Sequence, residues 1–182
     1  MVYMFLAEGF EEVEAIAPLD LLRRAGVQIE TVSIDPDRRS VPGSHGIYVM
    51  ADKSIDDINV SDAEMLILPG GAPGTVNLLE CEKLMAMLDE AVSSGKRIAA
   101  ICAAPAKILG AKGYLNGRVA TCYPGLENML SGAVFTPNSV VTDGNFTTSR
   151  GLGTACEFGI ELVSVLCGRE KAEEIRKSVV MS

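Results

Sequence analysis

The stretch Arg97-Ile-Ala-Ala-Ile-Cys-Ala-Ala-Pro-Ala-Lys-Ile-Leu109 decides the fold, because it predicts a buried strand, a sharp turn and a helix in immediate succession. Cys102 stands at the turn. A nucleophile in this position needs small residues two places to either side, and Ala100 and Ala104 meet that need. The start of a helix also favours the thiolate over the thiol. These features predict that Cys102 is the most acidic and most reactive thiol of the chain.

A structural interpretation of Cys102 is also open. Cysteine is a small apolar residue, and it fits an alanine-rich core without any reactivity being required. The sequence of this stretch alone does not decide between the two interpretations.

Strands and helices alternate on both sides of this stretch. Continuous apolar runs predict buried strands, and apolar residues at helical spacing predict the helices between them. The predicted strands are Val2 to Ala7, Val27 to Ile34, Ile47 to Met50, Met65 to Leu68, Arg97 to Ile101 and Arg118 to Thr121, and the predicted helices are Glu11 to Ala25, Leu84 to Gly95 and Ala103 to Leu109. This alternation indicates an α/β fold with a mainly parallel sheet and helices on both faces.

The last part of the chain adds a hairpin and two helices. Asp143-Gly144 predicts a two-residue hairpin turn, and Thr154 with Glu157 predicts a capping box for a helix that runs to Cys167. A final helix is expected to begin near Arg169. We find no linker or repeat, so a single domain over residues 1–182 is expected.

In a sheet of this kind ligands bind beyond the carboxyl ends of the strands. Three segments follow strands and carry polar or flexible residues: Ala7 to Glu14, Gly70 to Thr75, and Cys102 onward. Gly70 and Gly71 are expected to present backbone N–H groups beside the sulfur. The glutamates of the first segment are ordinary for the first turn of a helix, and spacing does not single out one of them.

Composition excludes several classes of partner. The chain has 182 residues, 48% of them hydrophobic, and a formal net charge of −8. Without a basic run, neither nucleic acid nor an anionic membrane is an expected partner. The first 17 residues contain four glutamates and no lysine or arginine, so we expect no signal peptide. We expect a cytoplasmic location instead.

The five cysteines are not spaced as a metal site. They stand at positions 81, 102, 122, 156 and 167, without a C-x-x-C motif. His45, the single histidine, has no Cys, Asp or Glu within four residues. We therefore expect reduced thiols, no metal and no organic cofactor.

Four motifs occur in order along the chain. They are Ala7-Glu-Gly-Phe-Glu-Glu-Val-Glu14, Leu68-Pro-Gly-Gly71, Ala99-Ala-Ile-Cys-Ala-Ala-Pro105 and Thr148-Ser-Arg-Gly-Leu-Gly-Thr154. Together they resemble the ThiJ/PfpI superfamily, in the branch of the Parkinson-associated deglycase and the bacterial ThiJ-type proteins. This resemblance implies a flavodoxin-like sandwich, as in the class I glutamine amidotransferases, and a homodimer.

The resemblance also implies roles for individual residues. Cys102 matches the oxidisable nucleophile, and Glu14 matches a carboxyl group that hydrogen-bonds to it, which we expect to be buried and protonated at neutral pH. Backbone donors beside the sulfur are then expected from three residues, and further pocket residues from three more. The donors are Gly70, Gly71 and Ala103, and the further pocket residues are Tyr123, Ser149 and Arg150.

Two positions depart from the family pattern. Ala103 stands where the protease-like branch has a histidine, so peptidase and amidotransferase activities lose their general base. Tyr123 stands where the deglycase branch often has a histidine. A tyrosine, with a reference pKa of about 10, is a poor base at neutral pH.

The resemblance implies a glyoxalase or deglycase that acts on 2-oxoaldehydes such as methylglyoxal, or on their protein adducts, through Cys102. The alternative is a redox-sensing, stress-protective, chaperone-like protein in which oxidation of Cys102 is the functional event. A weaker alternative is the thiamine-biosynthesis or protease I role that names in this superfamily suggest.

Overall fold

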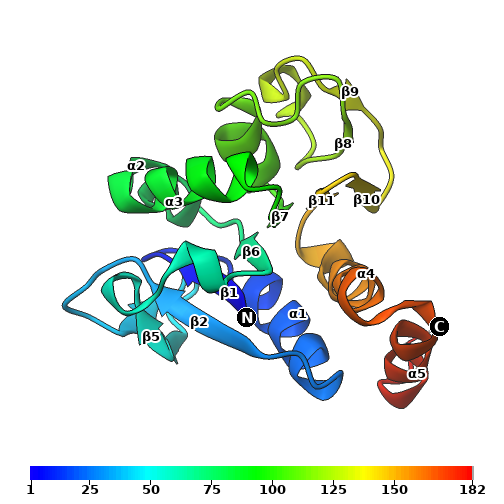
Figure 1. Cartoon of the computed structure of the whole chain (residues 1–182), viewed down its shortest axis with the longest axis horizontal. Coiled ribbons are helices and arrows are strands. Elements are labelled where there is room, and N and C mark those ends of the chain that lie inside the picture. The colour runs from blue at the N-terminus through cyan, green and yellow to red at the C-terminus, as the bar shows by residue number, and fades with distance from the viewer. Residues whose placement is uncertain (182) are drawn as a thin grey trace.

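A seven-stranded sheet forms the centre of the computed structural model, which describes residues 1–181 (Figure 1). The strand order is β10-β11-β7-β6-β1-β2-β5, and every neighbouring pair is parallel except β10 with β11. The strands are β1 (Val2–Leu6), β2 (Ile29–Ser33), β5 (Lys53–Ser54), β6 (Met65–Leu68), β7 (Arg97–Ile101), β10 (Val140–Asp143) and β11 (Phe146–Ser149).

Helices cover both faces of this sheet (Figure 1). One layer packs α1 (Glu12–Arg24), α4 (Ala155–Cys167) and α5 (Arg169–Ser178) against a core that includes Leu22, Phe158 and Ile175. The other layer consists of α2 (Gly74–Glu80), α3 (Glu82–Ser93) and a short π-helix (Pro105–Gly110). The predicted flavodoxin-like α/β sandwich is confirmed.

The central strand β1 shows why the sheet needs both layers. Tyr3 and Phe5 belong to the core on the α2–α3 side, whereas Val2, Met4 and Leu6 belong to the core on the α1–α4 side. All five residues are buried, because successive side chains of a strand point to opposite faces. A continuous apolar run is therefore what a strand covered on both faces requires.

Two small sheets lie outside the main one. The strands β3 (Ser40–Pro42) and β4 (Tyr48–Met50) form an antiparallel hairpin, and β8 (Val119–Ala120) pairs in parallel with β9 (Val134–Phe135). Short 3-10 turns complete the connections, at Ile55–Asp57, Val60–Asp62, Glu127–Met129 and Leu152–Thr154.

Two local predictions are wrong. The Thr154 side chain does not cap α4: a 3-10 turn precedes the helix, and the Thr154 hydroxyl instead bonds the Ser149 hydroxyl (2.7 Å) and the Gly151 carbonyl (2.8 Å). The hairpin turn lies one residue further along than predicted, because Asp143 is itself paired with Phe146.

One helix was missed, and one has a different form. The segment of α2 follows Pro73 and carries no helical repeat long enough to predict it. The helix after Cys102 is predicted as an α-helix from residue 103, and it is a π-helix over Pro105–Gly110.

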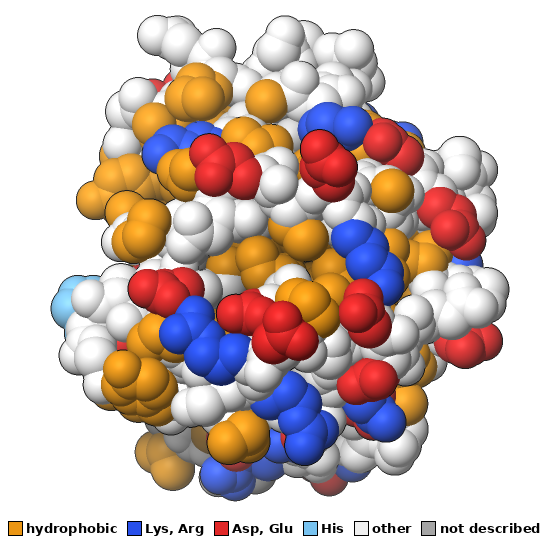
Figure 2. Space-filling model, turned by 90° about the vertical axis from the view of Figure 1, so that its left-hand side faces the viewer, with side chains coloured by type: hydrophobic (Ala, Val, Ile, Leu, Met, Phe, Trp, Pro, Cys, Tyr) orange, Lys and Arg blue, Asp and Glu red, His pale blue; other side chains and the backbone are white. Residues whose placement is uncertain are grey.

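The surface carries charges of both signs. On the face in Figure 2, acidic and basic side chains alternate around patches of hydrophobic ones. Among residues 1–181, no helix combines the length and the apolar character needed to cross a bilayer.

Strand order brings the predicted site together. The strands β1, β6 and β7 are consecutive neighbours and run parallel, so their carboxyl ends lie side by side. The segments that begin after Leu6, Leu68 and Ile101 consequently meet at one edge of the sheet.

Candidate functional site

Cys102 occupies a strained turn at the end of β7. Its φ angle is +66°, a left-handed conformation that costs a residue with a side chain about 1–3 kcal/mol. Hydrogen bonds on both sides hold it there: Cys102 N–H donates to the Ser149 carbonyl (3.0 Å), and the Cys102 carbonyl accepts from Tyr123 N–H (2.8 Å). The strain turns the sulfur out of the sheet and towards the segments after β1 and β6.

Glu14 is the carboxyl group at the sulfur. It lies in the first turn of α1, its residue is only 1% exposed, and its carboxyl is hydrogen-bonded to the Cys102 thiol. Its Oε2 accepts from Gly70 N–H at 3.0 Å. A Cβ atom at Gly70 would overlap that oxygen and lie 3.1 Å from the Cys102 sulfur, so only glycine fits between the two groups.

Burial controls the protonation of this pair. Burial raises the pKa of Glu14 to about 7, and the nearby Glu11 charge acts in the same direction. Burial likewise raises the pKa of the Cys102 thiol to about 12, together with the charge of Glu14. The N–H groups of Ala103 and Gly71 donate to the sulfur and lower its pKa, but not by enough to compensate.

Two expectations about the sulfur need correction. The helix start predicts an acidic Cys102, yet the pKa of this thiol is raised, because burial opposes the thiolate and the neighbouring Glu14 charge acts in the same direction. Gly70 was expected to donate to the sulfur side of the site, yet its N–H is already engaged by Glu14. Gly71 and Ala103 supply the donors at the sulfur.

Gly151 and Tyr123 form the rim of the site. A Cβ atom at Gly151 would lie 3.9 Å from the Cys102 sulfur, 3.7 Å from Glu14 Oε1 and 3.5 Å from the Tyr123 ring, so a side chain there would enter the site. Tyr123 is half exposed, and Leu152, also half exposed, donates its N–H to Glu14. The Tyr123 ring therefore borders the approach to the thiol.

Ser149 and Arg150 support the site from behind. The Ser149 side chain is fully buried and donates to the Ser139 carbonyl at 2.8 Å, so this residue serves Cys102 through its backbone carbonyl. The Arg150 guanidinium donates to the Pro137 carbonyl at 3.3 Å. Neither of these hydrogen bonds reaches Cys102 or Glu14, and a place for the two side chains in the pocket stays a prediction.

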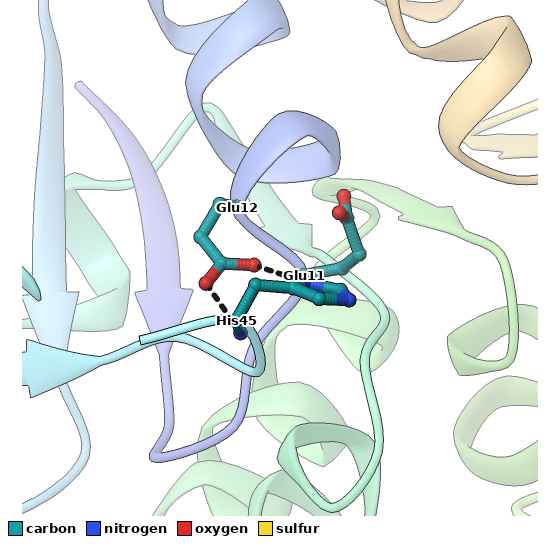
Figure 3. Close-up of side chains that lie close together, drawn as sticks. All are labelled: Glu11, Glu12 and His45. Atoms are coloured by element: carbon teal, nitrogen blue, oxygen red, sulfur yellow. Dashed lines mark hydrogen bonds and ion pairs between the residues drawn. The ribbon is translucent and has the colours of Figure 1, made fainter. Parts of the chain in front are cut away.

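A second cluster of polar side chains was missed. The Glu12 carboxylate, on α1, bonds the His45 ring at 3.0 Å, and Glu11 lies beside them (Figure 3). Thirty-three residues separate Glu12 from His45, so no local motif could reveal the pair. Burial by itself raises the pKa of Glu12, but hydrogen bonds from the His45 ring and from the N–H groups of His45 and Ile47 lower it to about 2.

Comparison with known proteins identifies the family. Residues 1–165 match the model of the DJ-1/PfpI family. The chain belongs to this family. Protein dj-1beta of Drosophila melanogaster is 34% identical over 181 residues, which cover 98% of this chain and 96% of that protein. A structure described as oxidized DJ-1 of Toxoplasma gondii superposes with a TM-score of 0.95 at 34% identity, covering 100% of this chain and 98% of that one.

Other members of the family differ in name and in length. The protein named Deglycase PH1704, from Pyrococcus horikoshii, is 37% identical over 154 residues, or 82% of this chain and 90% of the relative. Protein DJ-1 homolog B of Arabidopsis thaliana is 40% identical over 97% of this chain. The chain spans only 40% of the length of that plant protein.

Proposed function

We propose that the protein is a cysteine-dependent glyoxalase or deglycase that acts on 2-oxoaldehydes such as methylglyoxal or on their protein adducts. The observation that carries the proposal is the buried Glu14 carboxyl hydrogen-bonded to the Cys102 thiol, with a pKa of about 7. Both protonation states of Glu14 are populated at neutral pH, which is what a group that repeatedly takes and returns a proton requires. The deglycase name of a 37% identical relative agrees with this chemistry.

In the first step the Glu14 carboxylate takes the thiol proton while the Cys102 sulfur adds to the aldehyde carbon. The new S–C bond forms as the C=O π bond breaks, and its electron pair moves to the oxygen. The N–H groups of Gly71 and Ala103, which donate to the sulfur, are close to this oxyanion. Glu14 then returns the proton to the oxygen, which completes a hemithioacetal and regenerates the carboxylate.

In the second step Glu14 moves a proton between neighbouring carbons. It takes the hydrogen of the former aldehyde carbon as a proton. The electron pair left behind forms a C=C bond with the ketone carbon, and the ketone π pair moves to its oxygen, which takes up the proton of the neighbouring hydroxyl. Glu14 then returns its proton to the second carbon, where the C=C pair forms the new C–H bond, and the oxygen left without its proton forms the C=O bond of a 2-hydroxy thioester. The first carbon is oxidised and the second reduced, without an external oxidant. Water then cleaves the C–S bond and releases the 2-hydroxy acid and the thiol.

Lactate formation from methylglyoxal, without glutathione, tests the proposal. Cys102→Ser is expected to abolish turnover, because a hydroxyl lacks the nucleophilicity of the thiol. Cys167→Ser, at an exposed cysteine, is the matched control and should retain full activity. Wild-type protein with no more turnover than Cys102→Ser would contradict the enzymatic proposal.

Tyr123 allows a second, graded test. A well-placed base contributes about 10²–10⁴-fold to a rate, and a phenol in place of an imidazole should recover little of that. Tyr123→His should raise kcat because the ring stands at the rim of the site, whereas Tyr123→Phe should change it little.

A redox role is the second candidate, and the same carboxyl favours it. A protonated Glu14 can donate a hydrogen bond to a sulfinate at Cys102, which forms when the thiol reduces two equivalents of peroxide to water. Mass spectrometry after peroxide treatment should find two added oxygen atoms at Cys102 before any at Cys81, Cys156 or Cys167. Turnover of methylglyoxal without selective oxidation of Cys102 would favour the enzymatic role alone. Selective oxidation of Cys102 without turnover would favour the redox-sensing role.

We also propose a homodimer in the cytoplasm, where a reactive thiol stays reduced. An exposed apolar face, named here the α1–hairpin face, joins the outer side of α1 to the β3–β4 hairpin. Its members are Val13, Ile16, Ile47, Tyr48 and Met50. Val13, Ile16 and Ile47 line one groove between the two elements, and exposed apolar surface of this kind is typical of protein interfaces.

A further inference from the structure

Three ligand atoms form a nearly equilateral triangle next to the hairpin turn. Glu12 Oε2 and His45 Nδ1 are 3.0 Å apart, His45 Nδ1 and Ser44 Oγ are 3.0 Å apart, and Ser44 Oγ and Glu12 Oε2 are 3.2 Å apart. A carboxylate oxygen of Glu11 lies within 4.8 Å of a carboxylate oxygen of Glu12 and of a ring nitrogen of His45 (Figure 3). The α1 helix therefore presents two carboxylates to one imidazole.

We propose that Glu11, Glu12 and His45 form a binding site for a divalent transition-metal cation of the Zn²⁺ type. Bonds from zinc to imidazole nitrogen and carboxylate oxygen are about 2.0–2.2 Å long, so two ligands of a tetrahedral zinc are about 3.4 Å apart. The edges of the triangle, 3.0 to 3.2 Å, need to lengthen by only a few tenths of an ångström to reach this spacing. Ser44 offers a neutral oxygen at the third corner, and Glu11, whose Oε2 accepts from Glu14 N–H at 2.7 Å, has a ligand oxygen within 4.8 Å of the ligand atoms of Glu12 and His45.

The Glu12 carboxylate is held in place from its other side. Its Oε1 accepts from His45 N–H at 2.7 Å and from Ile47 N–H at 3.4 Å, while Oε2 faces the ring. Such supporting hydrogen bonds orient a metal-ligating carboxylate before the metal arrives. Glu12 is buried, whereas the His45 side chain is 72% exposed, so a cation can enter from solvent past the ring.

The charges and the ligand types select the class of ion. Among residues 1–181, the ion-pair partner of Glu12 is His45 and not a lysine or arginine, so the carboxylates of this cluster are not neutralised by a fixed cation. An imidazole nitrogen is a good ligand for Zn²⁺ and its neighbours in the first transition row, whereas Mg²⁺ and Ca²⁺ prefer oxygen alone. The cluster adjoins the Cys102 site, because Glu11 accepts from Glu14 N–H at 2.7 Å, but the proposal does not depend on the proposed reaction.

Titration with Zn²⁺ tests the site. The experiment uses full-length protein with Cys102→Ser, so that the site thiol does not compete for the metal. His45 is the only histidine, so its ring proton signals in NMR belong to one residue and need no assignment. They are expected to shift until one equivalent of Zn²⁺ has been added, in step with the heat measured by calorimetry.

Variants distinguish this site from adventitious binding. His45→Gln should lower the Zn²⁺ association constant at least tenfold, and because the side chain is exposed the fold should be unaffected. Glu11→Gln should lower it by a smaller factor. Glu8→Gln, at an exposed carboxylate that pairs with Arg38 instead, should leave it unchanged. Equal binding by His45→Gln, or saturating heat without movement of the ring signals, would overturn the proposal.

Discussion

At the scale of single residues, the site places two ionisable groups in contact, and each disfavours the negative charge of the other. Glu14 and Cys102 are hydrogen-bonded and buried, and both pKa values are raised, because neither charge is well solvated. A thiolate at Cys102 is less unfavourable when Glu14 holds a proton, although burial still opposes it. The acidity of the sulfur is therefore set by burial and by the carboxyl more than by the N–H groups of Ala103 and Gly71.

The pKa of Glu14 predicts how stability changes with pH. The pKa of Glu14 is about 7 in the native state and about 4.3 in the unfolded state. The contribution of protonated Glu14 to the free energy of unfolding is therefore fully present below about pH 4.3 and is lost as pH rises through 7. The loss should reach about 4 kcal/mol in all, of which about 3 kcal/mol falls above pH 5. Urea unfolding at pH 5 and pH 8.5 measures this change in the free energy of unfolding. Glu14→Gln should remove the change, whereas Glu80→Gln, at an exposed glutamate, should leave it in place. Parallel pH profiles for wild type and Glu14→Gln would contradict the assignment.

The left-handed backbone at Cys102 predicts that glycine is more stable than alanine at this position, the reverse of the usual order. At its φ of +66° any Cβ atom is unfavourable, so Cys102→Gly should be more stable than Cys102→Ala by about 1 kcal/mol. At Ala111, with φ of −61° on the exposed surface, Ala→Gly should instead cost about 0.5–1 kcal/mol. Urea unfolding of the four proteins measures both differences. A Cys102→Ala protein as stable as Cys102→Gly would show that the turn is not strained.

At the scale of elements, the three glutamates at the start of α1 make different contacts. Glu11 accepts from Glu14 N–H at 2.7 Å and caps the helix, Glu12 holds the turn of the β3–β4 hairpin, and Glu14 reaches Cys102. Acidic residues are common in a first turn, so composition alone could not separate them. Their tasks differ because successive residues of a helix point about 100° apart, towards different neighbours.

The sequence predicted the elements whose signals are local. Buried strands such as β1, β6 and β7, and the helices α1, α3 and α5, follow from apolar runs and helical spacing. The placement of Glu14, which the family resemblance supplied, agrees with the structure, although its catalytic role stays a prediction. The Glu12–His45 pair and the use of Gly70 by Glu14 depend on strand order and on side-chain direction, which periodicity does not report.

The crossing of α1 and α4 depends on one glycine. A Cβ atom at Gly159 would lie 2.6 Å from Leu21 Cδ1 and 2.9 Å from Pro18 Cα, so Gly159→Ala should push the helices apart and cost about 1–3 kcal/mol. Gly153→Ala is the control, because a Cβ atom there meets nothing within 4 Å. Thermal unfolding of both variants measures the difference. Equal melting temperatures would mean that the two helices adjust without strain.

At the scale of the whole molecule, the α1–hairpin face is the surface on which we expect two copies to associate. Tyr48, on the hairpin side of this face, is 67% exposed, and a charge there should prevent the burial that drives association. Tyr48→Asp should therefore shift the protein from dimer to monomer in light scattering. Val134→Asp, at an equally exposed apolar residue on β9, should not. A Tyr48→Asp dimer would place the interface elsewhere.

The bond from Cys102 N–H to the Ser149 carbonyl has a consequence for synthesis on the ribosome. The partner of the elbow is translated 47 residues after it, so β7 and the segments that carry Glu14 and Gly70 emerge well before the elbow can close. Until β11 has left the exit tunnel, only the bond from Tyr123 N–H can hold Cys102, and the bond on its other side is missing. The nascent chain is thus expected to carry a cysteine with a less constrained backbone, and the fixed elbow forms only after residue 149 has emerged.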